Sequence, residues 1–98
     1  MEVVVNKNET NLNVKVSGEL NTVTSPNFEN EVVPQLKGIK NLVLDFKDLE
    51  YISSAGLRSI LVMLKLMEKQ GEMKIINAND AVKNIFAMTG FDSVLNIE

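Results

Sequence analysis

The chain has 98 residues, 45% of them hydrophobic and 23% charged, and a formal net charge of −3 at pH 7. This is typical of one globular domain, residues 1–98, rather than a disordered segment. The absence of cysteine and histidine excludes a disulfide framework and removes the commonest general base and metal ligand, and the acidic balance disfavours nucleic acid as a direct partner. We find no signal peptide and no apolar run near the ~20 residues of a membrane span, which favours a cytoplasmic location.

The N-terminal segment predicts a β-hairpin. Residues 2–6 contain three consecutive valines, and apolar and polar side chains alternate through residues 11–17. Such alternation is typical of a strand with one buried face. The polar residues 7–10 predict the turn between the two strands, and Gly18 is expected to end the second strand.

A first helix is predicted to start at Ser25-Pro26, with Ser25 as the N-cap and Pro26 in the first helical position. Pro34 lies inside this helix and removes one of its backbone hydrogen bonds. We therefore expect the helix to bend or end between Gln35 and Gly38. The residues predicted to face the core share one helical face and are Phe28, Val32 and Leu36.

The second half alternates predicted strands and helices. Asn41–Phe46 is nearly all apolar, as in a strand covered on both faces, and Lys47–Glu50 is expected to be a polar connection. After the next helix come a strand at Met73–Asn77, a helix capped by Asp80 and ended by a left-handed Gly90, and a short apolar tail. The apolar stripe predicted for the central helix consists of Leu57, Ile60, Leu61, Leu64 and Met67.

The predicted element order is ββαβαβα with a short C-terminal tail, which defines an α/β fold. Strands joined through helices pair in parallel with right-handed crossovers, and sites in such sheets gather at the carboxyl ends of the strands. The loop Ser17–Thr24 and the junction Tyr51–Arg58 both follow strands. We therefore expect them on the same rim of the sheet.

The junction Tyr51–Arg58 reads YISSAGLR and carries two adjacent hydroxyls. At a helix start the backbone N–H groups point outward and attract negative charge. Two interpretations follow: Ser53 or Ser54 simply caps the helix while Gly56 allows close packing, or Ser54 is a switch residue. In both, Ser54 is predicted in the first helical turn, directly after the strand Asn41–Phe46.

Catalytic motifs are absent. The sequence has neither GxxxxGK[ST] nor GxGxxG, so no cofactor is predicted, and without histidine a serine–histidine–acid triad is impossible. The acidic residues Asp45, Asp48 and Glu50 could bind a divalent cation, but a solvated turn with one capping aspartate is the favoured interpretation. We therefore predict no catalytic residue, no metal site and no enzymatic activity.

Three segments resemble one known family. DFKDLEYISSAGLRSILVMLK is similar to the core motif of the STAS domain, specifically that of stand-alone bacterial anti-sigma factor antagonists. GELNTVTSPNFENEV resembles the segment after the family's second strand, and KIINANDAVKNIFAMTGFDSVLNI resembles its last strand and helix. The resemblance covers nearly the whole chain, in order and at the right spacing.

The resemblance implies a STAS-like fold, a small mixed sheet with helices wound as a β-α superhelix. It also implies partner switching in transcription regulation. The unphosphorylated antagonist binds an anti-sigma factor that is also a serine kinase, and this frees the sigma factor. Phosphorylation of one serine separates the complex, and a PP2C-type phosphatase restores it. The expected partners are thus the anti-sigma factor/serine kinase and the phosphatase.

The site residues carry over through the family's D-S-S-G-L pattern. Ser54 matches the phosphoacceptor, and Gly56-Leu57 matches the last two positions. Ala55 stands at the second serine, and Ser53 stands at the aspartate, where the sequence departs from the pattern. Asn21 is a second departure, because it replaces the aspartate of the GELD turn. The rim is therefore less acidic than the pattern implies, and Ser53 is a rival phosphoacceptor.

A partner surface is expected beside Ser54. On a helical wheel Val62 and Leu66 point away from the apolar stripe, so they are either covered by neighbouring helices or exposed for a partner. Arg58, one turn after Ser54, could pair with a partner carboxylate or with phosphate. If Leu66 is exposed and at the interface, Leu66→Asp is predicted to weaken partner binding while leaving the thermal midpoint nearly unchanged. The predicted partner-binding residues are Asn21, Ser53, Ser54, Ala55, Gly56, Arg58, Val62 and Leu66.

Two functions remain. The favoured one is an anti-sigma factor antagonist, or a related partner-switching protein with another target, controlled by phosphorylation of Ser54. The alternative is a STAS subunit of another assembly, such as a lipid-transport complex at the inner membrane, in which the serine is never phosphorylated.

Overall fold

The computed structural model describes all residues, 1–98. The chain forms five strands, three α-helices and two 3-10 turns. None of the helices combines the length and apolarity that crossing a membrane requires. In chain order the elements are β1 (Glu2–Asn8), β2 (Asn11–Leu20), α1 (Ser25–Val32), η1 (Val33–Gln35), β3 (Asn41–Asp45), β4 (Leu49–Ile52), α2 (Ser54–Glu68), β5 (Glu72–Ile76), α3 (Asp80–Thr89) and η2 (Phe91–Ser93).

The sheet is mixed, as predicted. β1 and β2 form the antiparallel hairpin, and β2, β3 and β5 follow in parallel, giving the order β1-β2-β3-β5. The first half of β2 pairs with β3, and its last three residues pair in parallel with β4. β2 therefore pairs with both β3 and β4, and its carboxyl end lies beside that of β4.

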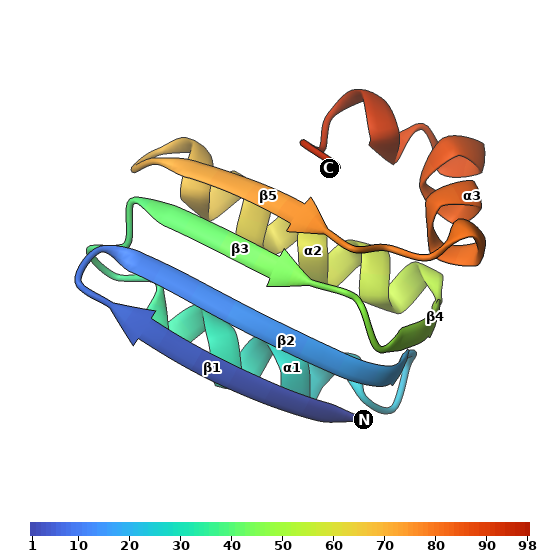
Figure 1. The fold of residues 1–98 in the computed structure, drawn as a ribbon, viewed down its shortest axis with the longest axis horizontal. Coiled ribbons are helices and arrows are strands. Elements are labelled where there is room, and N and C mark those ends of the chain that lie inside the picture. The colour runs from blue at the N-terminus through green and yellow to red at the C-terminus, as the bar shows by residue number, and fades with distance from the viewer.

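The helices are distributed unevenly over the sheet. Figure 1 shows α1 and α2 on one face of the sheet and α3 beyond its end, near β4, while the other face carries no helix. The alternating side chains of β2 explain this arrangement, because the polar ones point to the open face and the apolar ones to the helices. The fully buried apolar residues of β2 and β3 are Leu12, Val14, Val16, Leu20, Leu42 and Leu44.

β4 is the element that the sequence did not predict. The segment 47–50 was expected to be a polar connection, but Leu49–Ile52 is a strand. Its two ends are buried and the two residues between them are exposed. This spacing lacks the alternation that reveals a half-buried strand. The observed order is thus ββαββαβα, and the junction with Ser54 follows β4 rather than β3.

The first helix begins and ends differently from the prediction. Thr24 occupies the N-cap position, whereas Ser25 is the first helical residue and its buried Oγ has no hydrogen-bond partner. The α-helix already ends at Val32, and the turn containing Pro34 is a 3-10 turn. The change to 3-10 geometry before Pro34 fits its missing N–H and its clash with the preceding turn. The expected end between Gln35 and Gly38 was therefore placed too late.

The buried face of α2 is rotated from the predicted stripe. Met63 is fully buried, whereas Leu61 and Leu64 are only half-buried. Gly56 and Ser59 also lie on the buried face. Small residues bring a helix close to its neighbours without adding apolar surface, so a hydrophobic pattern overlooks them.

The C-terminal region agrees with the prediction apart from one cap. Asn79, not Asp80, is the N-cap of α3, and its Oδ1 accepts a hydrogen bond from the Val82 N–H at 2.8 Å. Gly90 ends the helix in the left-handed conformation with φ 79°, as expected. The tail then returns to the sheet, where Ile97 forms a single parallel bridge with Ile75.

Candidate functional site at the amino end of α2

The carboxyl ends of β2 and β4 join two segments that are distant in sequence. Glu19 pairs with Tyr51 and Leu20 with Ile52, and the Ser53 N–H donates a hydrogen bond to the Leu20 carbonyl at 2.8 Å. The loop after β2 and the start of α2 consequently lie at the same end of the molecule, as Figure 1 shows. The predicted common rim is confirmed.

Gly56 permits this close approach. A Cβ atom at Gly56 would lie 2.7 Å from Cγ1 of Ile52 and 2.9 Å from Cβ of Leu20. Carbon atoms do not come this close without displacing one another. The glycine therefore sets the distance between the first turn of α2 and the carboxyl ends of β2 and β4.

Ser54 is exposed and is the first helical residue of α2. No acidic residue lies in the first turn of this helix. The unpaired N–H groups and the helix dipole make this position favourable for negative charge. The predicted placement of Ser54 in the first turn, and not in the core, is confirmed.

Ser53 is the N-cap residue of α2, but its side chain makes no capping hydrogen bond to the helix. The residue is half-buried, and its Oγ is fully buried without a hydrogen-bond partner. Only the Ser53 carbonyl takes the N-cap role, by accepting from the Leu57 N–H at 3.0 Å. Of the two adjacent hydroxyl-bearing residues, Ser54 is the exposed one, whereas the Ser53 hydroxyl is shielded from solvent.

Asn21 organises the loop between β2 and α1. Its Oδ1 accepts hydrogen bonds from the N–H groups of Val23 and Thr24 at 2.9 and 3.0 Å. The Asn21 N–H donates to Thr24 Oγ1 at 2.9 Å, and that hydroxyl donates to the Glu19 carbonyl at 2.7 Å. Asparagine and aspartate share this turn-forming chemistry, so the loop geometry does not depend on a charge at this position.

The remaining predicted partner-binding residues lie on α2 with different exposure. Arg58 is exposed and Ala55 is half-buried. Val62 is 39% exposed. Leu66 is half-buried and packs against the core, which supports the alternative that it is covered rather than fully exposed for a partner. The exposed helical surface beside Ser54 therefore contains Arg58 and Val62, with Leu66 at its margin.

The rim carries two exposed apolar residues whose exposure was not predicted from the sequence. Val23 lies in the loop after β2 and is 84% exposed, and Tyr51 of β4 is 48% exposed. The only indication in the sequence that Val23 is exposed was its place between two threonines in a predicted loop. Tyr51 would have been found only with β4, because its exposure follows from the strand's position.

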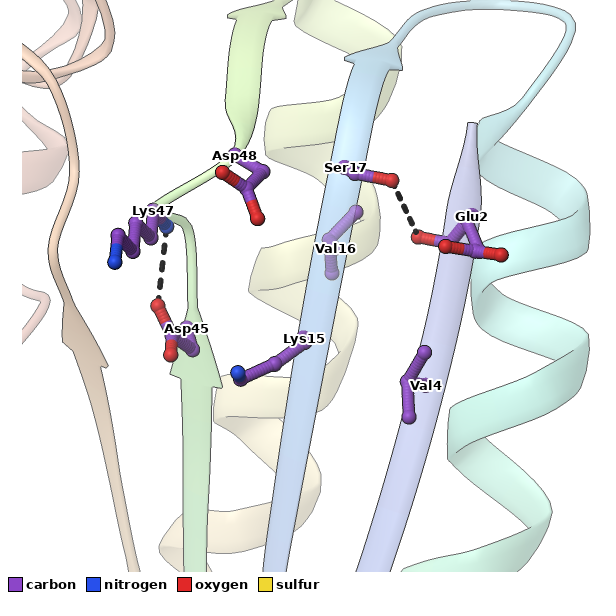
Figure 2. A pocket seen from close by; sticks show the side chains of 8 residues that line it. All are labelled: Glu2, Val4, Lys15, Val16, Ser17, Asp45, Lys47 and Asp48. Atoms are coloured by element: carbon purple, nitrogen blue, oxygen red, sulfur yellow. Dashed lines mark hydrogen bonds between the residues drawn. The ribbon is translucent and has the colours of Figure 1, made fainter.

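The predicted acidic residues surround the turn between β3 and β4: Asp45 ends β3, Asp48 lies in the turn, and Glu50 belongs to β4. Asp45 accepts a hydrogen bond from the Lys47 N–H at 3.0 Å, the capping interaction that was expected. Figure 2 shows Asp45 and Asp48 in a small hollow of about 90 Å³ together with Lys15 and Lys47. The carboxylates thus lie among cationic side chains, and no cluster of acids here or elsewhere has the arrangement of a metal site.

The comparisons with known proteins agree with this architecture. The family description STAS domain matches residues 2–98. A Bordetella bronchiseptica protein, provisionally named the anti-sigma factor antagonist BtrV, is 33% identical, with 99% of this chain and 85% of that protein covered. The anti-sigma-B factor antagonist of Bacillus subtilis is 28% identical, with 99% and 90% covered.

Solved structures show the same fold at lower identity. The anti-sigma factor antagonist SpoIIAA in its unphosphorylated form superposes with a TM-score of 0.85 at 14% identity, over 99% of this chain and 88% of that one. The phosphorylated form of Bacillus SpoIIAA superposes with a TM-score of 0.76 at 13% identity, over 99% and 91%.

These matches define the class of protein. The chain belongs to the STAS domain family, in the branch of anti-sigma factor antagonists. Members of this branch are regulators and not enzymes.

Proposed function

We propose that this protein is a phosphorylation-controlled partner-switching protein. In its unphosphorylated form it binds an anti-sigma factor that is also a serine kinase. Phosphorylation of Ser54 releases it, and a PP2C-type phosphatase restores the binding form. The observation that carries the proposal is the exposed Ser54 at the amino end of α2, next to a Ser53 hydroxyl that is buried.

The position of Ser54 supports an effect on binding rather than on folding. A phosphate adds about −1.5 to −2 charge at neutral pH. At the amino end of a helix this charge is locally favourable by up to about 1 kcal/mol, so the fold accommodates it. A partner surface that covers the unmodified serine must instead desolvate the phosphate or meet it with like charge, which costs several kcal/mol.

The proposed partner surface surrounds this serine. Arg58 and Val62 extend it along α2, and Asn21 belongs to the loop on the other side. Ala55 and Gly56 shape the first turn, and Leu66 contributes at its exposed margin. An exposed arginine and apolar side chains are the residue types that are enriched in protein interfaces.

The relatives give the proposal its partner class. Two of them carry names that assign them to anti-sigma factors, and SpoIIAA exists in unphosphorylated and phosphorylated forms. From that role we infer a cytoplasmic location, because sigma factors act in the cytoplasm. Its exposed serine favours this role over that of a STAS subunit in a lipid-transport assembly, which needs no phosphoacceptor.

The test is a binding measurement with the kinase of the source bacterium. Affinity is compared for the unmodified chain and for the chain phosphorylated at Ser54. We expect a loss of about a hundredfold or more, because like charge at an interface costs several kcal/mol and each ~1.4 kcal/mol is tenfold. Equal affinities would contradict the switch and favour a STAS subunit of another assembly.

A further inference from the structure

Val23 is the most exposed apolar side chain at the rim, and it does not belong to the hydrophobic core. It is 84% exposed, and its neighbours on both sides are threonines. A single exposed valine is ordinary on a protein surface. Two features distinguish Val23 from such a residue. Its loop is held by hydrogen bonds, and that loop lies beside the surface around Ser54.

The loop holds Val23 in one conformation. Both hydrogen bonds to Asn21 Oδ1 come from the backbone at the loop tip, at 2.9 Å from the Val23 N–H and 3.0 Å from the Thr24 N–H. Thr24 closes the loop onto the Glu19 carbonyl at 2.7 Å. An exposed side chain on an ordered loop binds with a smaller entropy loss than one on a mobile loop.

Asn21 has no acceptor left for another molecule. A side-chain amide oxygen carries two lone pairs, and both face backbone N–H groups of this loop. The residue is also half-buried. It can therefore shape the loop, but its oxygen cannot receive a hydrogen bond from a cationic side chain of a partner without opening the turn.

The loop is continuous with the surface around Ser54. Leu20, directly before the loop, accepts the hydrogen bond of Ser53 at 2.8 Å, and its Cβ is one of the atoms that Gly56 approaches. The base of this loop therefore lies against the amino end of α2, so a partner that covers Ser54 binds beside the loop.

We propose that Val23 is an apolar anchor of the partner surface and that Asn21 is the residue that positions it. This rests on the proposed function, and the occupant is the same anti-sigma factor kinase that covers Ser54. Its surface opposite the loop carries an apolar pocket for Val23. Recognition at the loop is thereby apolar in this chain, at a position where a family aspartate would offer a charge.

The positioning role is tested on the isolated protein. Amide hydrogen exchange at Val23 and Thr24 is compared for the wild type, Asn21→Ala and Asn21→Asp. We expect slow exchange in the wild type and in Asn21→Asp, because aspartate offers the same acceptor, and exchange about tenfold faster or more in Asn21→Ala. Equally slow exchange in Asn21→Ala would overturn the assignment of Asn21.

The anchor is tested with the purified kinase that binds the wild-type chain. Val23→Ser is expected to weaken binding about tenfold, the scale of a truncated anchor residue, with an unchanged thermal midpoint. Val94→Ser is the matched control, since Val94 is 58% exposed but lies after η2 in the C-terminal segment, and it should change affinity less than about twofold.

The outcomes separate this inference from the proposed function. If phosphorylation of Ser54 weakens binding and Val23→Ser does not, the anchor is refuted and the switch stands. If Val23→Ser weakens binding and phosphorylation does not, the switch falls while the loop remains an interface. If no kinase of the source bacterium binds the wild-type chain, both proposals fall.

Discussion

The Ser53 N–H donates a hydrogen bond to the Leu20 carbonyl at 2.8 Å, and this contact joins the two halves of the site. Leu20 ends β2 and Ser53 precedes α2, so the bond ties the Asn21 loop to the amino end of the helix. A change in one segment is therefore expected to move the other.

Gly56→Ala is expected to destabilise the protein by up to about 2 kcal/mol. Alanine improves helix propensity by about 1 kcal/mol, but its Cβ would lie 2.7 Å from Ile52 and 2.9 Å from Leu20, and overpacking of this kind costs about 1–3 kcal/mol. Because both contacts belong to the rim, partner affinity should fall as well. Chemical denaturation measures the change in free energy of unfolding, and a more stable variant would show that the close approach is not tight.

Ser53→Ala is expected to leave the free energy of unfolding unchanged or to raise it by up to about 1 kcal/mol. Replacing an N-cap serine normally costs about 1 kcal/mol, because a side-chain hydrogen bond is lost. Here Oγ is buried and makes no hydrogen bond, so the substitution removes an unsatisfied polar group. A loss of more than 1 kcal/mol in a denaturant titration would mean that the hydroxyl has a partner in solution.

Val62→Asp and Leu66→Asp are expected to separate binding from stability. Val62 is 39% exposed, so the aspartate should weaken partner binding while lowering the free energy of unfolding by less than about 1 kcal/mol. Leu66 is half-buried against the core, so its aspartate variant should lose about 1–2 kcal/mol of stability. Thermal unfolding of the two variants checks this order, and an unchanged midpoint for Leu66→Asp would indicate that Leu66 is exposed.

Ser54→Asp is expected to bind the kinase more weakly without destabilising the fold. The first turn of α2 contains no acidic residue, so a carboxylate there should add about 0.3–1 kcal/mol through the helix dipole. Salt screens this interaction, so the gain should shrink at high ionic strength. Ser54→Ala is the control, with constitutive binding and no such gain. Unfolding of Ser54→Asp at a lower temperature than the wild type would contradict the account.

Strong periodicity made most of the fold predictable. The alternating apolar residues of β2 and the regular apolar spacing in the helices gave the hairpin, the parallel sheet and the rim that carries Ser54. β4 was missed because Leu49 and Ile52 are buried three positions apart, a spacing that does not indicate a strand. Its existence depends on pairing with the end of β2, which is a tertiary interaction.

The details of the site were less predictable. Threonine and serine stand side by side at the start of α1, and asparagine and aspartate at the start of α3, so the cap could be displaced by one residue. Burial of the Ser53 hydroxyl and partial burial of Leu66 depend on how α2 packs against the rest of the fold. A helical wheel contains no information on that packing.

Mass-spectrometric mapping of the phosphorylated residue decides whether Ser54 or Ser53 is the phosphoacceptor. The wild-type chain and the Ser54→Ala variant are incubated with the cognate kinase and ATP, and the peptide that contains both serines is fragmented. The account predicts phosphate on Ser54 of the wild type and none on the variant. Phosphate on Ser53, or on neither serine, would contradict it.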